Sequence, residues 1–175
     1  MKDDMLNKQF GDNKELQTFL KSIEENSSEK IKLFCLLSLG TGLRVNELLS
    51  LKFNDIDEKN STLSITSDKT RSGKQSKHEV AIHSSILAEL KKEKELNPID
   101  IYIFQSKKSN NVNNQTKKPL TRQAINFAFS KANRCDGTSI TPSKLRQIYI
   151  EKFFASVKNQ ASHFLKKNYW NNLQR

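Results

Sequence analysis

Apolar side chains recur at helical spacing at the start of the chain. A first helix is predicted within residues 13–26, where apolar positions lie three or four residues apart: Leu16, Phe19, Leu20 and Ile23. Asp12 or Asn13 can cap this helix, because both side chains accept hydrogen bonds from the free amides at a helix start. A polar Asn-Ser-Ser run ends it, and a second, strongly apolar helix is predicted over residues 29–39.

The apolar run is then interrupted at Gly40-Thr41-Gly42, and a single cation, Arg44, follows. Another apolar helix begins directly behind it, with three leucines on its buried side: Leu48, Leu49 and Leu51. Glycine lets the backbone turn sharply and approach a neighbour closely. An arginine at such a joint is held by packed helices on both sides and can present its guanidinium to a phosphate with fixed geometry. The alternative is a surface ion pair between Arg44 and Glu47, which lie three positions apart.

The middle of the chain changes to an alternating pattern. Residues 61–66 and 78–83 place apolar side chains at every second position: Leu63, Ile65, Val80 and Ile82. Such alternation predicts two half-buried strands. The polar loop between them contains Gly73, so the strands are predicted to form a β-hairpin or part of a small sheet. The preceding residues 52–60 are predicted to be a turn-rich acidic link.

Helical spacing returns after residue 83. Ser84 or Ser85 is predicted to cap a helix that ends near Leu96, and residues 101–104 are predicted to form a short edge strand. Two more helices are predicted to begin at threonine caps, Thr121 and Thr141. The second has proline at its first position, where a missing N–H costs nothing. A last short helix is predicted around three apolar residues: Ala161, Phe164 and Leu165.

These patterns predict an α+β fold that is mostly α-helical and contains a small antiparallel sheet. Residues 1–12 are predicted to be a loose leader, and residues 13–175 one domain. The longest apolar stretch is too short to cross a bilayer, and the polar N-terminus does not resemble a signal peptide. We therefore expect a cytoplasmic protein without a membrane partner.

Charge is distributed unevenly along the chain. The formal net charge is +11, yet residues 1–30 carry five basic and seven acidic side chains. Residues 105–122 hold five cations and no acid, and residues 136–175 hold seven cations against two acids. Basic segments that a fold can bring to one face are typical of proteins that bind a polyanion. The alternative is that the lysines serve only solubility.

The two cysteines predict neither a disulfide nor a metal site. Cys35 lies inside the apolar run, where it is expected to be a buried small hydrophobe, and Cys135 is isolated far from it. No metal and no cofactor are expected.

The sequence around Arg44 has a wider pattern. Thr41-Gly42-Leu43-Arg44 is followed by Glu47-Leu48-Leu49 and then by Leu-Lys-Phe-Asn-Asp-Ile-Asp. This arrangement resembles the first arginine box of the tyrosine recombinases, the phage integrase family. The resemblance implies a helical catalytic domain with a small antiparallel sheet, and double-stranded DNA as the partner. It also implies that Arg44 binds the scissile phosphate and that Glu47 supports this arginine.

A second segment, residues 141–149, resembles the second box of that family, usually His-x-x-Arg. Arg146 matches its arginine, and Ser143 stands at the usual histidine, three positions earlier on the same helical face. Serine can hydrogen-bond a phosphate oxygen but is a poor proton carrier at neutral pH. Gln147, where a second histidine is common, does not titrate either. The neighbouring Lys144 is a further candidate for DNA binding.

The hairpin loop matches a third part of the family, in which a lysine in a β-turn protonates the leaving oxygen. Lys69 is the best-placed candidate for this role and Lys74 the second. Together with Arg71 they would also bind the DNA backbone. The alternative is a basic hairpin that binds DNA without taking part in chemistry.

The C-terminal segment departs from the family pattern. The resemblance puts Lys167 where the family has a histidine or tryptophan, and the position of the nucleophilic tyrosine then falls beyond Arg175. Tyr169 is the tentative nucleophile, although it comes earlier than the family spacing. The usual N-terminal core-binding domain is also expected to be missing.

We therefore expect a DNA-binding protein of the recombinase type that acts in or regulates site-specific recombination or integration, with impaired or absent strand cleavage. One alternative is an active recombinase that forms a 3′-phosphotyrosine through Tyr169, in trans through exchange of the C-terminal segment. Partners other than DNA would then include another recombinase or a second copy bound through the C-terminal helix. The other alternative is a helical protein-interaction module without a DNA function.

Overall fold

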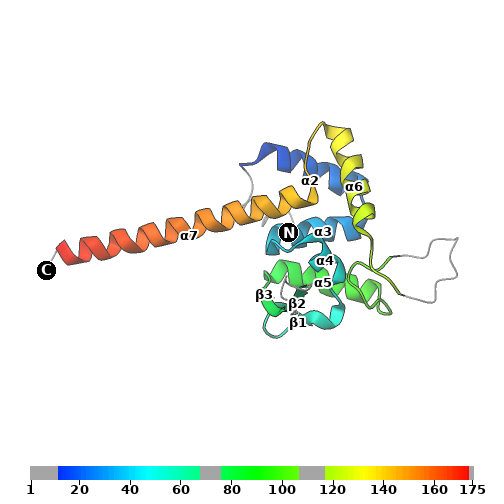
Figure 1. Cartoon of the computed structure of the whole chain (residues 1–175), viewed down its shortest axis with the longest axis horizontal. Helices are drawn as coiled ribbons and strands as arrows, with labels where there is room; N and C mark the ends of the chain where they lie inside the picture. Colours follow the sequence, from blue (N-terminus) through cyan, green and yellow to red (C-terminus); the bar gives the residue numbers. More distant parts are fainter. Residues whose placement is uncertain (1–11, 68–75, 107–116, 174–175) are drawn as a thin grey trace.

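The computed structural model describes residues 12–67, 76–106 and 117–173, with the side chains of residues 12–66, 77–106 and 117–158. Helices and one three-stranded sheet follow one another in the order shown in Figure 1. The elements are α2 (Lys14–Asn26), α3 (Glu29–Thr41), α4 (Val45–Ser50), the short 3-10 helix η1 (Phe53–Asp55), β1 (Ile56–Asp57), β2 (Thr62–Ser67), β3 (Ser76–Ala81), α5 (Ser84–Leu96), α6 (Arg122–Asp136) and α7 (Pro142–Leu173).

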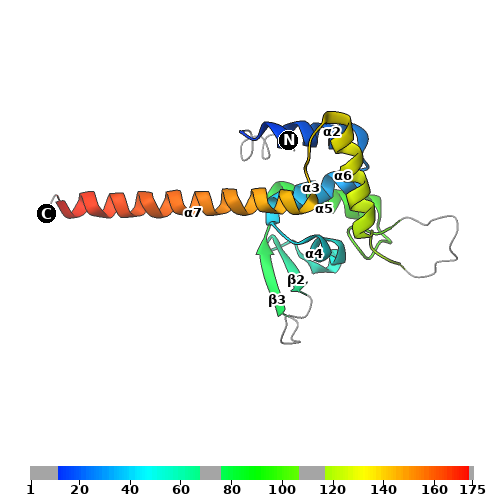
Figure 2. The same cartoon turned by 45° about the horizontal axis from the view of Figure 1, so that its top comes forward.

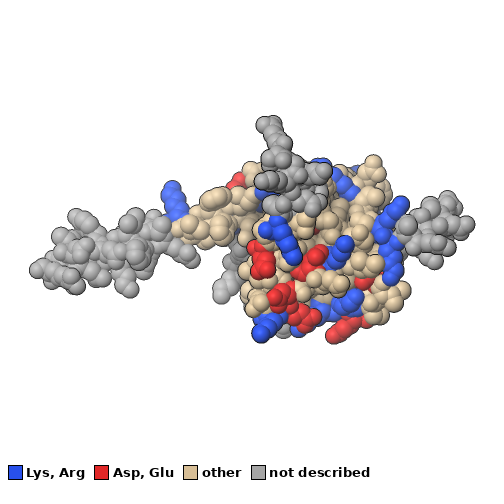
Figure 3. Space-filling view, turned by 60° about the horizontal axis from the view of Figure 1, so that its bottom comes forward, with Lys and Arg blue, Asp and Glu red and all other residues tan. Residues whose placement is uncertain are grey.

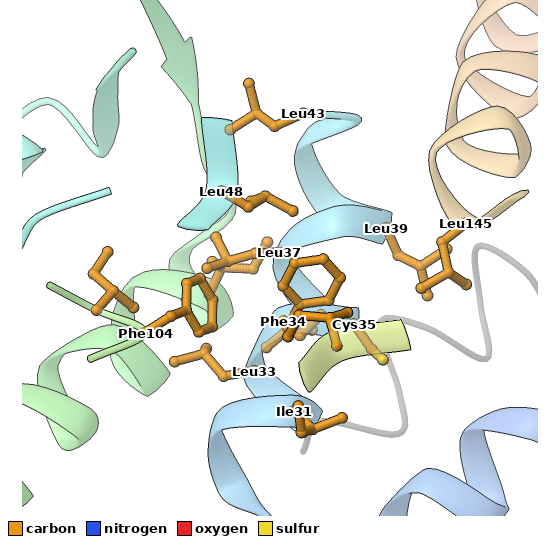
Figure 4. Close-up of a cluster of buried hydrophobic side chains, with 14 of the residues drawn as sticks. Ile31, Leu33, Phe34, Cys35, Leu37, Leu39, Leu43, Leu48, Phe104 and Leu145 are labelled. Carbon is orange, nitrogen blue, oxygen red and sulfur yellow. The ribbon is translucent and has the colours of Figure 1, made fainter. Parts of the chain in front are cut away.

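Helix α3 lies at the centre of the body, in contact with α2, α4, α5 and α7 (Figures 1 and 2). Its apolar residues point in every direction, and nearly all of them are buried, as expected for a helix surrounded by others. Figure 4 shows Leu39 of α3 beside Leu145 of α7, and Phe34 on the side of Phe104. The rings of Phe34 and Phe104 are 5.7 Å apart, and Phe34 also meets Phe129 of α6 edge-on.

The sheet is antiparallel, with the order β1-β2-β3. Leu63 in the central strand pairs with Ile56 on one side and Val80 on the other, and its side chain is fully buried. The hairpin prediction is confirmed for β2 and β3. The acidic link predicted for residues 52–60 is corrected, because it contains η1 and the extra edge strand β1. Residues 101–104 are not a strand. Within them, Tyr102 forms an isolated antiparallel bridge with Lys52.

Local side-chain caps begin several helices. Asn13 accepts a hydrogen bond from the amide of Leu16 at 2.9 Å, and Thr121 accepts one from Ala124 at 3.2 Å. Helix α5 differs from the prediction, because its cap is His83 rather than a serine. The Nδ1 atom of His83 accepts a hydrogen bond from the amide of Ser85 at 3.2 Å.

A buried charged cluster fastens the loop after α5 to the start of α3. Lys30 lies 2.9 Å from Asp100 and 3.7 Å from Glu93, and it donates to the carbonyl of Gln105 at 3.0 Å. The side chains of Lys30, Glu93 and Asp100 are only 11%, 7% and 15% exposed. Buried charges of this kind depend on one another, because an uncompensated charge in the interior is strongly unfavourable.

Lys30→Ala is therefore expected to lower the free energy of unfolding by about 3 kcal/mol, since it leaves two carboxylates buried beside each other. Urea denaturation followed by circular dichroism measures the change. Lys32→Ala is the matched control, because Lys32 pairs with the exposed carboxylates of Glu29 and Glu24. That variant is expected to lose less than about 1 kcal/mol. Equal losses would show that burial of the cluster contributes nothing.

Helix α7 corrects the prediction for the C-terminal region. It is one continuous helix from Pro142 to Leu173, not a helix followed by a second short one. No glycine or proline occurs after Pro142, so no residue of the segment breaks the helix. Its first turns pack on α3, and the rest projects away from the body (Figures 1 and 2). Among the described residues, no helix combines the length and apolarity that spanning a bilayer requires.

Candidate functional site

Arg44 sits immediately before α4, in extended conformation, and its partner is Glu47 one turn later. The carboxylate of Glu47 accepts a hydrogen bond from the Arg44 backbone amide at 2.7 Å and lies 3.2 Å from Nη1 of its guanidinium. The two side chains differ greatly in exposure, at 68% for Arg44 and 10% for Glu47. The buried carboxylate of Glu47 therefore orients the guanidinium of Arg44 and leaves most of it accessible to a ligand.

Arg146 reaches the same joint from the other side. Its Nε donates a 2.8 Å hydrogen bond to the carbonyl oxygen of Gly42, two residues before Arg44 in the chain. Leu145 and Ile148, on the adjacent faces of α7, are buried against the body. The two arginines, about a hundred positions apart in sequence, are thus attached to one short loop. An arginine bound through Nε keeps its terminal nitrogens for an anion such as a phosphate.

Gly42 makes this approach possible. It ends α3 in the left-handed conformation, with φ of 65°, and a Cβ at this position would lie 2.6 Å from Cε1 of Tyr149 and closer still to Cδ1. The Tyr149 ring therefore lies directly on the glycine backbone, one turn after Arg146 on α7. This close packing sets the distance between the loop and α7.

Ser143 lies one turn before Arg146 and lines a groove of about 430 Å³ between α4, α6 and the start of α7. The groove also contains Arg122 and Asn126 of α6 and Val45, the residue after Arg44. The described residues that line it include no acid. Sequence patterns had marked Arg122 only as one of several cations, because nothing in the chain order brings α6 beside α4.

Lys144 faces away from this groove. Its Nζ lies 2.8 Å from Glu15 of α2, and the other oxygen of Glu15 accepts hydrogen bonds from the amide and hydroxyl of Ser139, both at 3.0 Å. The hydrogen bond from Lys144, followed by those from Ser139, lowers the pKa of Glu15 below its ordinary value. Glu15 thus ties α2 to the turn that precedes α7.

Glu15→Gln is expected to reduce stability most at neutral pH. Because the pKa of Glu15 is lowered in the folded state, its contribution is present above the ordinary value of 4.5 and is lost as the pH falls below it. The melting temperatures of the wild type and the variant should therefore differ near pH 7 and converge in acid. Glu25→Gln, at an exposed position of the same helix, serves as the control. A difference that stays constant with pH would contradict the assignment.

Comparison with known proteins identifies the family. A model of the phage integrase family matches residues 9–156, most of the chain. The chain belongs to the phage integrase family. A relative from Bacillus thuringiensis, the TnP I resolvase, is 29% identical over 162 residues, which cover 85% of this chain and 51% of the relative. The chain therefore spans about half the length of this curated relative.

Solved integrase and recombinase structures share the fold. The lambda integrase catalytic core superposes with a TM-score of 0.61 at 22% identity, covering 82% of this chain and 85% of that one. Residues 75–356 of lambda integrase bound to DNA give 0.61 at 20% identity, covering 83% and 51%. XerA recombinase gives 0.55 at 19% identity, covering 77% and 46%. The predicted fold, mostly helical with a small antiparallel sheet, is confirmed.

Other candidate residues of the integrase pattern lie outside what the structure describes. Lys69, Arg71 and Lys74 fall between β2 and β3, in residues 68–75. Lys167 and Tyr169 lie on α7, beyond its described side chains. Their assignments stay predictions.

The backbone of α7 nevertheless constrains Tyr169. It lies 23 residues after Arg146 on one continuous helix, which corresponds to about 35 Å along the helix axis. This distance is far beyond the reach of a tyrosine side chain. The backbone of Tyr169 is therefore far from that of Arg146 in the same chain.

The side of the body on which β1 and α5 lie has a mixed charge pattern. Figure 3 brings forward the side of Figure 1 on which β1 and α5 lie, and basic and acidic side chains are interspersed there. Ion pairs such as Lys91 with Glu58 contribute to the mixing. The described residues of this face therefore mix both signs of charge and do not form a single-sign field that attracts a polyanion.

Proposed function

We propose that this chain binds double-stranded DNA as a recombinase-type protein in site-specific recombination or integration, holding one backbone phosphate between Arg44 and Arg146. The observation that carries the proposal is the shared loop. Arg44 is oriented by the buried Glu47 and stays largely exposed, while Arg146 is anchored on the Gly42 carbonyl beside it. Two fixed guanidinium groups at one loop suit a tetrahedral anion with several acceptor oxygens.

The neighbouring groove extends the proposed DNA surface. Ser143 and Arg122 line it next to the arginine loop, and the family fold supports DNA as the polyanion. In this proposal Lys69, Arg71 and Lys74 add backbone contacts from the hairpin loop. Residues 13–175 act together as a catalytic-type unit.

Strand cleavage by a single chain is proposed to be impaired or absent. Ser143 and Gln147 stand where titratable histidines are usual, so proton transfer to and from the phosphate lacks its usual carriers. The separation of Tyr169 from Arg146 along α7 removes the nucleophile from its own site.

A second candidate function follows from the same helix. The projecting α7 carries Tyr169 away from its own body, which favours delivery of the tyrosine to another subunit. Solved relatives include a lambda integrase tetramer bound to a Holliday junction. We propose self-association through α7 as the form in which this chain could cleave DNA.

Covalent trapping on nicked duplexes, selected from a random-sequence library, tests both candidates. The first predicts DNA binding without a covalent adduct. The second predicts an adduct that Tyr169→Phe abolishes and that Tyr149→Phe, the matched tyrosine control, preserves.

A mixture of two defective variants tests delivery between subunits. Arg44→Ala keeps Tyr169, and Tyr169→Phe keeps the arginines, so cleavage in trans predicts an adduct on the Arg44→Ala chain only when both are present. An adduct formed by the Arg44→Ala chain alone would exclude this arrangement.

Binding as a function of salt separates DNA binding from a protein-interaction module. For a protein that contacts phosphates, the logarithm of the DNA affinity falls linearly with the logarithm of the salt concentration. If the chain does not bind duplex DNA at low ionic strength, both DNA-binding proposals fail and the protein-interaction module is the remaining function.

A further inference from the structure

A second hollow, also of about 430 Å³, lies behind the Gly42 joint and is not part of the proposed phosphate site. It is bounded by the end of α3, the start of α5 and the part of α7 that leaves the body. The apolar part of its lining consists of Gly40, Ile86 and the rings of Tyr149 and Phe153. Its volume is in the range of cavities that bind a ligand or a large side chain.

The aromatic rings of α7 leave a surface open beside this hollow. The rings of Tyr149 and Phe153 are stacked, with centroids 6.1 Å apart and planes inclined by 18°. Phe153 is nevertheless 49% exposed, and the adjacent Phe154 is 65% exposed. An exposed aromatic face next to an apolar cavity favours a further aromatic or aliphatic side chain as its occupant.

One cation, Lys152, lies at the edge of the hollow, and it contacts the first described residue of the chain. Lys152 and His83 line the rim. Lys152 lies 3.6 Å from the carboxylate of Asp12, at the N-terminal edge of the described structure. The preceding segment contains two acids, two lysines and four apolar residues, the last being Met1, Met5, Leu6 and Phe10. The four apolar residues suit an apolar hollow, and the pairing of Asp12 with Lys152 places the end of this segment beside it.

We propose that this hollow is the docking site of the chain's own N-terminal segment, with the side chain of Phe10 seated between Ile86, Tyr149 and Phe153. Phe10 is two residues from Asp12, and therefore its Cα is within about 7 Å of the Asp12 Cα. The ion pair between Asp12 and Lys152 holds the entry of the segment at the rim. No residue of the proposed phosphate site takes part.

The docked segment would act on the phosphate site through Tyr149. This ring lines the hollow on one side and covers Gly42, the acceptor of the Arg146 hydrogen bond, on the other. Filling the hollow holds the ring against the glycine. The N-terminal segment is thus an intramolecular brace for the arginine loop.

Disulfide trapping tests this proposal. The exposed Cys135 is first replaced by serine, and the buried Cys35 stays. Gln9→Cys is then combined with Ser156→Cys, which lies on the hollow, or with Lys158→Cys as the matched control on the same exposed stretch of α7. Two residues along an α-helix correspond to about 200° of rotation, so position 158 faces away from the hollow.

The expected result is a disulfide within one chain, formed about tenfold faster at position 156 than at position 158 because docking raises the local concentration of the two thiols. Its rate is independent of protein concentration. Adding Phe10→Ala slows the reaction about tenfold by removing the buried ring, whereas Asn7→Ala leaves the rate unchanged.

Two results would overturn the proposal. Disulfides between two chains, with a rate that rises with protein concentration, would show that a second copy occupies the hollow. Equal rates at positions 156 and 158 that do not respond to Phe10→Ala would show that the segment does not dock there. Neither result depends on DNA binding, so failure of this proposal is distinct from failure of the proposed function.

Discussion

Arg146→Ala is expected to weaken binding to duplex DNA about tenfold or more, because one charge-assisted contact to a phosphate contributes roughly 1.5–3 kcal/mol. The slope of log affinity against log salt should also fall by about one. Fluorescence anisotropy at several salt concentrations measures both quantities. Arg44→Ala is expected to have a similar effect, since its guanidinium stays 68% exposed beside Glu47.

Arg146→Lys distinguishes fixed geometry from charge alone. Lysine keeps the positive charge but lacks the Nε–H that Gly42 binds and the planar fork of the guanidinium, so most of the affinity loss should remain. Lys92→Ala, at an exposed position of α5, controls for a general loss of charge and should change the affinity little. Equal effects of the Lys92 and Arg146 variants would reject the phosphate site at the arginine loop.

Gly42→Ala is expected to lower the free energy of unfolding by about 3 kcal/mol, from the left-handed backbone and from overpacking. The backbone at Gly42 has φ of 65°, and the added Cβ would overlap the Tyr149 ring. The overlap pushes α7 away from the loop, so the Arg146 hydrogen bond to Gly42 is lost as well. Urea denaturation and DNA affinity should therefore both reveal the change.

Gly137→Ala is a matched control for the backbone term. Gly137 has nearly the same φ, 67°, but no atom lies within 4 Å of a Cβ built there. Only the cost of the left-handed backbone remains, about 1–2 kcal/mol, and DNA affinity should be unchanged. If the two glycine variants lost the same stability, the contact between Gly42 and Tyr149 would contribute nothing to the fold.

Local patterns predicted most of the helices and the hairpin. The spacing of Leu16, Phe19 and Ile23 and the threonines at 121 and 141 mark helices that the structure contains. These features depend on neighbouring residues only. Amphipathic spacing and side-chain caps act within one or two turns, so they can be recognised without knowing the rest of the fold.

Three features of the fold were missed or misjudged, and only the first of them depends on a distant partner. Strand β1 has only two residues, and it is a strand because Ile56 lies opposite Leu63 of β2. The cap of α5 was assigned to serine, although His83 fills that position. The end of α7 was divided into two helices on the apolar residues Ala161, Phe164 and Leu165, whereas the segment after Pro142 contains no glycine or proline that would break the helix.

The sequence by itself determined that the chain is largely helical, that Arg44 stands at a glycine joint with Glu47 one turn away, and that Arg146 is a second candidate for a phosphate. Periodicity and turn chemistry depend on neighbouring residues, and the order of motifs is read directly along the chain. Only the tertiary structure decided that Arg146 binds the Gly42 carbonyl, that Lys144 pairs with Glu15, and that Arg122 lines the adjacent groove. The first two contacts join residues more than a hundred positions apart, and the groove brings together residues of α4, α6 and α7.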